Sequence, residues 1–176
     1  FDDDGAGPRP AGLYATGFFQ VAGGVAANHI ARWGGASWEP LGLGLDDTGA
    51  CLTVHDDGMG DRLFVGGYFG AAGGAPARAI AQWDGNSWSA MAVPIGTTST
   101  WVWSMASFDS DGVGPVGKEL YVGGRALRVG TTNVATAKWT GSTWTFSGDG
   151  SLGWQAVNML RVIDLGGVPE LHAARD

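Results

Sequence analysis

The sequence predicts an all-β protein made of β-propeller blades, in which each blade is a sheet of four antiparallel strands. The first observation behind this prediction is a repeat of about 50 residues, in which Leu13–Gly17 returns as Leu63–Gly67 and again as Leu120–Gly124. Self-similarity at such a period is typical of repeat architectures. The second observation is that no segment has a sustained apolar period of about 3.6 residues, which indicates that helix is nearly absent.

The composition fits many short strands joined by tight turns. Of the 176 residues, 32 are glycine and 9 are tryptophan, and 44 % are hydrophobic. Glycine adopts the backbone angles that tight turns require. The hydrophobic residues supply the burial that a disordered chain lacks.

The central repeat indicates the four strands of one blade in order. Ala50–His55 is short, apolar and partly β-branched and ends at an Asp-Asp-Gly turn, which is typical of a strand. Arg62–Val65 is predicted as the second strand, Ala79–Trp83 as the third and Ser87–Met91 as the fourth. Residues 84–86, Asp-Gly-Asn, tolerate positive φ and favour a hairpin before the last strand.

The predicted units amount to a little over three blades in one repeat domain. Their approximate ranges are 1–48, 49–97, 98–152 and, in part, 153–176. The last unit contains only a first and a second strand, at Gln155–Ile163 and Glu170–Ala174. Propellers usually close with four to eight blades. We therefore expect an incomplete propeller, either because the natural chain is longer or because copies associate through open blade edges.

A pair of tryptophans flanks the hairpin between the third and fourth strand of each unit. The pairs are Trp33 and Trp38, Trp83 and Trp88, and Trp139 and Trp144. Rings at these positions can wedge between neighbouring blades and bury on the order of 200 Å² each. Because the pair recurs in every unit, packing is favoured over a sugar-binding platform.

The order of these motifs resembles the kelch family of propellers. A di-glycine ends the second strand at Gly66-Gly67, and aromatic residues follow in the third and fourth strands at Trp83 and Trp88. The chain is most similar to bacterial secreted proteins with LYVGG-F-AGG-IA-W-DG-W repeats. It departs from that form at Thr16-Gly17 and over residues 125–132. The resemblance implies a propeller fold and an extracellular or cell-surface location, and it implies little about function.

Charge and cysteine content exclude several function classes. The net charge is −7, and no basic stripe that would bind nucleic acid is visible. No apolar run is long enough to insert across a membrane. Cys51 is the single cysteine, which excludes an intramolecular disulfide and is interpreted as a small core residue.

An acidic turn follows each predicted first strand. These turns are Asp2–Gly5, His55–Gly58, Asp109–Gly112 and Asp164–Gly167. Carboxylates at positions i and i+2 before a glycine resemble the start of calcium loops, including those of FG-GAP propeller repeats. Asp109 and Asp111 form the best such pair, so calcium is the one cofactor considered. A plain Asp-Gly turn explains all four segments without a metal.

Three tryptophans outside the repeated pairs are candidates for ligand binding. Trp101 and Trp103 are expected on one face of a first strand together with Met105, and Trp154 lies at the corresponding approach to the next one. These residues either pack between blades or form a ligand surface near the central channel.

The leading hypothesis is a non-enzymatic extracellular scaffold or binding module that presents loops to a macromolecular partner, or for self-assembly. Loops 18–28, 68–78 and 125–133 join second to third strands and should therefore share one rim. One alternative is a carbohydrate-binding module that uses Trp101, Trp103 or Trp154. Another is part of a propeller enzyme whose catalytic residues lie outside this segment, because no catalytic constellation is visible.

Overall fold

The computed structural model of the protein describes residues 1–2, 11–91, 95–97, 99–112, 117–146, 156–164 and 166–174. Within these ranges the chain forms strands, turns and bends and contains no helix. The all-β prediction is therefore confirmed.

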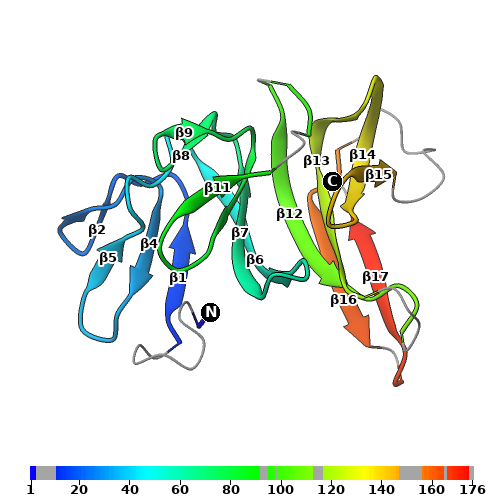
Figure 1. The fold of residues 1–176 in the computed structure, drawn as a ribbon, viewed down its shortest axis with the longest axis horizontal. Coiled ribbons are helices and arrows are strands. Elements are labelled where there is room, and N and C mark those ends of the chain that lie inside the picture. The colour runs from blue at the N-terminus through cyan, green and yellow to red at the C-terminus, as the bar shows by residue number, and fades with distance from the viewer. Residues whose placement is uncertain are drawn as a thin grey trace.

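Four antiparallel sheets follow one another along the chain (Figure 1). The first contains β1 (Leu13–Thr16), β4 (Ile30–Trp33) and β5 (Trp38–Pro40). The second contains β6 (Gly49–Asp56), β7 (Asp61–Gly67), β10 (Ile80–Trp83) and β11 (Trp88–Ala90). The third contains β12 (Trp101–Phe108), β13 (Glu119–Val129), β14 (Thr132–Trp139) and β15 (Trp144–Phe146). The fourth contains β16 (Met159–Asp164) and β17 (Pro169–Ala174).

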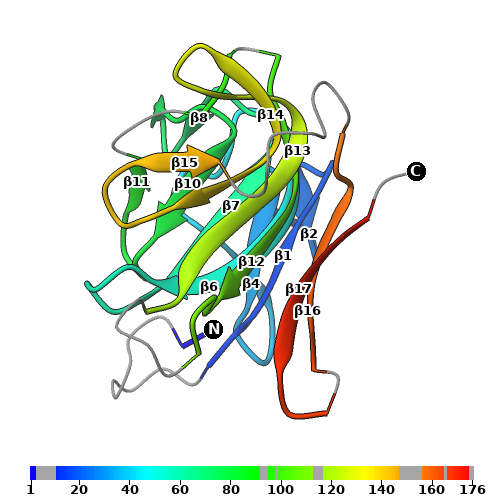
Figure 2. The same cartoon turned by 90° about the vertical axis from the view of Figure 1, so that its right-hand side faces the viewer.

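Each of the two four-stranded sheets is a simple meander in which sequential strands pair. The first strands of successive sheets are neighbours, since β12 contacts both β6 and β16. Figure 2 shows β11 and β15 toward one side of the molecule and β16 and β17 toward the other. The sheets thus lie side by side in chain order, with their faces packed against one another.

Two small hairpins extend the connections between second and third strands. They are β2 (Val21–Ala22) with β3 (Val25–Ala26), and β8 (Ala71–Ala72) with β9 (Ala75–Pro76). Their turns are glycine pairs with positive φ, 54° and 86° at Gly23 and Gly24, which favours a tight two-residue hairpin. The sequence pattern gave no sign of strands here because each spans only two residues.

The meander topology gives the molecule two distinct ends. We call the end with the two small hairpins and the turn between β13 and β14 the hairpin rim. We call the opposite end, with the β6–β7 turn and the β14–β15 turn, the turn end. In Figure 1 the β8–β9 hairpin and the tip of β13 and β14 lie on the same upper side, as expected for connections between second and third strands.

Alternating side chains of one strand pack into two different hydrophobic cores. Along β7, Leu63 and Val65 pack against the first sheet, whereas Phe64 between them packs against the third. Along β13, Leu120 packs toward the second sheet and Tyr121 toward the fourth. This period of two residues is the geometry of a strand buried on both faces. It explains why these strands read as continuous apolar runs.

The tryptophan pairs are direct cross-strand partners in all three sheets. Their ring centroids are 5.6, 5.2 and 5.2 Å apart. The second pair packs toward the first sheet, where the Trp88 indole N–H donates to the carbonyl of Leu41 at 2.7 Å. Trp139 and Trp144 are buried in the core between the second and third sheets. These two pairs therefore confirm the interpretation that they pack between neighbouring sheets.

Candidate functional site

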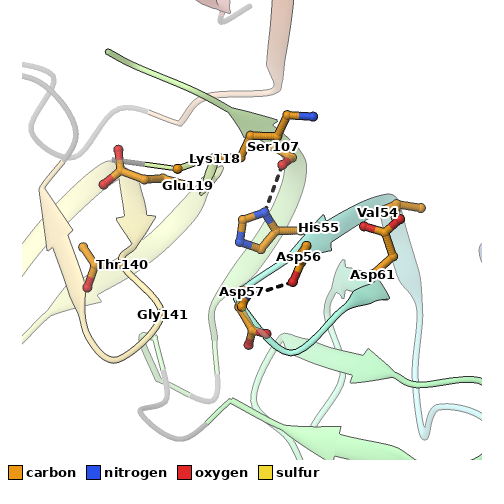
Figure 3. A pocket seen from close by; sticks show the side chains of 12 residues that line it. Val54, His55, Asp56, Asp57, Asp61, Ser107, Lys118, Glu119, Thr140 and Gly141 are labelled. Atoms are coloured by element: carbon orange, nitrogen blue, oxygen red, sulfur yellow. Dashed lines mark hydrogen bonds between the residues drawn. The ribbon is translucent and has the colours of Figure 1, made fainter. Parts of the chain in front are cut away.

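A cleft of about 800 Å³ opens at the turn end, between the second and third sheets (Figure 3). One wall is the end of β6 with its turn, which contributes His55, Asp56 and Asp57. The other wall comes from the third sheet, with Ser107 on β12 and Glu119 on β13. A cleft of this size lies within the usual range of small-molecule sites.

His55 lies against the inner wall of the cleft and is only 2 % exposed. Its Nδ1 is 2.9 Å from the Oγ of Ser107, and Figure 3 shows the ring pointing toward that residue. The ring also packs edge-on against Phe64. Burial lowers the pKa of His55, and the opposing effect of Asp57 does not cancel it. The imidazole is therefore neutral at pH 7, and its hydrogen bond joins the two sheets.

Glu119 is a buried carboxylate in a network of donors. Lys138 Nζ donates to it at 2.9 Å, the Tyr121 hydroxyl at 3.0 Å and the Ser110 hydroxyl at 3.2 Å. Burial alone would raise the pKa of Glu119, but the hydrogen bonds, led by the one from Lys138, outweigh it and lower the pKa. Glu119 is thus ionised, and the charge of Lys138 compensates it.

Among the described residues, the carboxylates of the β6–β7 turn form no ion pair with a Lys or Arg side chain. Asp56 Oδ1 accepts the backbone N–H of Gly58 at 2.8 Å and so holds the turn. Asp57 Oδ1 is buried and has no hydrogen-bond partner among the described residues. Asp61 adds a third carboxylate, while Lys118 is the one Lys or Arg among the lining residues that the structure describes. The cleft therefore has surplus negative charge and a buried acceptor that no donor among the described residues reaches.

An aromatic row crosses from the second to the third sheet at the hairpin rim. Trp101 stacks on Tyr68, with ring centroids 4.6 Å apart and the ring planes at 15°. Trp103 lies next in the row, 6.3 Å from Trp101 between centroids. All three rings are half-buried. The structure thus brings the predicted pair together and adds Tyr68, while Trp154 lies outside the described residues.

The face predicted to be shared by Trp101, Trp103 and Met105 is not formed. The pairing register of β12 with β13 shifts between Val102 and Ser104, which marks a β-bulge. A bulge inserts one residue and so changes which side chains share a face. Val102 and Met105 consequently both lie in the core between the second and third sheets. Simple alternation along the sequence could not reveal the extra residue.

The acidic turn at Asp109 and Asp111 forms a local hydrogen bond, since the Asp111 N–H donates to Asp109 Oδ1 at 3.2 Å. Across the described part of the chain, no group of three or more His, Cys, Asp or Glu side chains is placed to hold a metal ion. Calcium binding at this pair stays a prediction.

Cys51 lies partly buried against the core between the second and third sheets. Burial raises the pKa of its thiol to about 12, so the thiol is protonated at neutral pH and a poor nucleophile. The part of the chain that the structure describes has no helix long and apolar enough to cross a membrane.

No protein-family model, no curated protein and no solved structure matches the chain.

Sequence reasoning named His55 but did not bring it together with Ser107 or Glu119. The signal that could have done so is the repeat itself, because first strands of adjacent sheets are neighbours. Val54 pairs with Leu63, and Ser107 pairs with the equivalent Leu120. Ser107 therefore stands where the preceding repeat has the apolar Val54. A polar residue at this position, on the strand next to the one that carries His55, indicates a polar contact between the second and third sheets.

Proposed function

We propose that the protein is a non-enzymatic, extracellular binding module built from kelch-like propeller blades. The sequential pairing of four strands in each complete sheet supports this architecture, as does the contact between first strands of adjacent sheets. The location follows from the resemblance of the repeats to those of secreted proteins. Copies of the chain associating through open sheet edges would be a second use of the same scaffold.

The partner that we propose for the cleft is a protein segment bearing an arginine or lysine side chain. The observation that carries this proposal is the buried Asp57 Oδ1 without a hydrogen-bond partner among the described residues. A buried carboxylate oxygen is unfavourable unless a donor reaches it. A guanidinium group supplies several donors and a positive charge in one planar unit. Asp56 and Asp61 in the same wall add to the attraction.

The experiment compares two capped tripeptides, acetyl-Gly-Arg-Gly-amide and acetyl-Gly-Glu-Gly-amide, titrated into the protein and followed by calorimetry and amide chemical shifts. We expect saturable binding of the arginine peptide that weakens with salt, and none of the glutamate peptide. Asp57→Asn should weaken binding by about tenfold or more, because a hydrogen-bonded charge pair is lost.

The matched control is Asp109→Asn. Asp109 also belongs to an acidic turn, but it does not line the cleft. This variant should bind the arginine peptide like the original protein. Equal binding of the two peptides, or an Asp57→Asn variant with unchanged affinity, would contradict the proposal. Shift changes confined to residues outside the cleft would contradict the assigned place.

A catalytic function has one observation in its favour, the contact of Ser107 Oγ with the neutral, buried His55. Such a pair could make the serine nucleophilic. Treatment with an aromatic sulfonyl fluoride separates the two functions. A binding module should show no more labelling than its Ser107→Ala variant, whereas a hydrolase would be labelled at Ser107.

A further inference from the structure

A second pocket, of about 290 Å³, lies at the hairpin rim. It is at the opposite end of β7 from the cleft, a separation of about 20 Å along the strand. Asp46 and Asp47 line it from the connection between the first and second sheets. Tyr68 and Arg78 line it from the segment around the β8–β9 hairpin, and Thr97 from the connection to the third sheet.

The walls of this pocket are tied to one another by hydrogen bonds. Asp46 Oδ1 accepts the backbone N–H groups of Gly70 and Ala71, both at 2.8 Å. Asp47 Oδ1 accepts the backbone N–H of Thr48 at 2.7 Å. Each carboxylate thus uses one oxygen for the backbone. Its second oxygen makes no such bond within the described part of the chain and remains able to accept from a ligand.

Tyr68 supplies a fixed aromatic surface in the wall. Trp101 covers one face of its ring in a near-parallel stack, and this holds the ring in one orientation. The backbone N–H of Tyr68 donates to the carbonyl of Thr48 at 2.8 Å, which ties the same residue to the segment directly before β6. A ligand can therefore stack only on the face of Tyr68 that Trp101 leaves open.

We propose that this pocket binds a neutral pyranose of a glycan. An aromatic ring beside carboxylate acceptors and a guanidinium donor matches the two kinds of surface on a sugar, its C–H face and its hydroxyl groups. Asp46 and Asp47 accept hydroxyl protons, and Arg78, which is exposed, donates to a hydroxyl or ring oxygen. Two carboxylates against one guanidinium disfavour a sugar acid. The pocket volume is near the lower limit for small-molecule sites, which fits one ring rather than a long chain.

This site is independent of the cleft and of the partner proposed there. The probes are methyl glucoside, methyl galactoside and methyl mannoside, each as both anomers, with methyl glucuronide as the acidic comparison. Binding is followed by tryptophan fluorescence, because Trp101 stacks directly on Tyr68, and by saturation-transfer NMR. We expect at least one neutral glycoside to bind saturably and the glucuronide to bind at least about tenfold more weakly.

Three variants test the assigned contacts. Tyr68→Phe should keep binding, because the stacking surface remains, whereas Tyr68→Ala should abolish it. Arg78→Met should weaken binding by about tenfold, since one charged hydrogen bond is lost. Because Arg78 is exposed, this variant tests the site even if Tyr68→Ala fails to fold. Arg128→Met, at a half-buried hairpin-rim arginine outside the pocket that bonds the carbonyl of Thr131, is the control and should bind normally.

The proposal is overturned by any of three results. One is that none of the neutral glycosides binds saturably. Another is that Arg78→Met binds with unchanged affinity, because the predicted donor would then play no part. The last is that the glucuronide binds as well as the neutral sugars, which would contradict the charge argument.

Discussion

The seam between the first and second sheets and the seam between the second and third sheets are built from the same repeat but differ at both ends. At the turn end, the first seam has an apolar pocket of about 250 Å³ that includes Leu13, Tyr14 and Val54. The second seam has the polar cleft, in which Ser107 stands at the position of Val54. One substitution in the repeat thus replaces an apolar contact by a hydrogen bond to His55.

The two seams differ in the same way at the hairpin rim. Tyr68 of the second sheet stacks on Trp101 of the third. Phe18 stands at the position equivalent to Tyr68 in the first sheet and is 86 % exposed. The residue equivalent to Trp101 is Thr48, which offers no ring to stack on. The comparison shows that recurring residues form the scaffold. Unrepeated residues distinguish the second seam, namely Ser107 in the cleft and the stacked Tyr68 and Trp101 at the hairpin rim.

The largest expected effect compares a buried and an exposed phenylalanine. Phe64 is fully buried between the second and third sheets, so Phe64→Ala should lower the free energy of unfolding by about 3–5 kcal/mol. Phe18→Ala should change it by no more than about 0.5 kcal/mol, because the ring is exposed. Urea denaturation followed by tryptophan fluorescence measures both. Similar losses for the two variants would show that the first seam is packed as tightly at its rim as the second is in its core.

An intermediate effect is expected for two ion pairs whose cations occupy equivalent positions while their carboxylates do not. Lys138 pairs with Glu119 at 2.9 Å in the third sheet, where the Glu119 side chain is 8 % exposed. Arg32, at the equivalent place in the first sheet, pairs with Glu39 at 3.3 Å, and the Glu39 side chain is 49 % exposed. Glu119→Gln should cost about 1–3 kcal/mol, since it leaves the Lys138 ammonium group without an ionised partner.

Glu39→Gln is the control and should cost no more than about 1 kcal/mol, because water screens the exposed carboxylate. Arg32 is buried, but it has a further interaction besides the one with Glu39. The two variants are compared by their urea midpoints at neutral pH. A larger loss of unfolding free energy for Glu39→Gln than for Glu119→Gln would contradict the prediction. It would mean that the buried network around Glu119 does not stabilise the third sheet.

Most of the fold could be predicted because it follows from residues that recur. The di-glycine and the tryptophan pair located the strands to within a few residues, for example β7 at Asp61–Gly67 against a predicted Arg62–Val65. The β-bulge at Val102 and Ser104 could not be predicted. It depends on how two strands pair, and nothing in the alternation of apolar residues marks it.

The candidate sites were less predictable than the fold because each combines residues of different sheets. His55 and Ser107 are separated by 52 positions, and their contact requires knowing which strands are neighbours. Tyr68 was placed in a loop, and only the structure shows that it stacks on Trp101. The sequence pattern predicts which side chains share a face of one strand. A site also depends on which strands are neighbours and on the distances between them.

The smallest effect concerns the pH dependence of the second seam. The pKa of His55 is lowered by burial, so below its ordinary value of 6.5 the unfolded chain binds a proton more readily than the folded one. The contribution of the neutral, buried His55 to the free energy of unfolding should therefore be fully present above about pH 6.5 and decrease as the pH falls below this value. Urea midpoints measured at about pH 7.5 and about pH 5.5 should show this difference, and His55→Gln should reduce it.

His172 provides the control for this pH dependence. It is 45 % exposed and pairs with Glu170 at 3.3 Å, away from the seam, so His172→Gln should retain the decrease in stability toward acidic pH. A decrease that disappears with His172→Gln and persists with His55→Gln would assign the titration to the fourth sheet. His55 would then no longer distinguish the second seam by its pH dependence. The first seam has the apolar Val54 facing the first sheet, and this side chain has no titratable group.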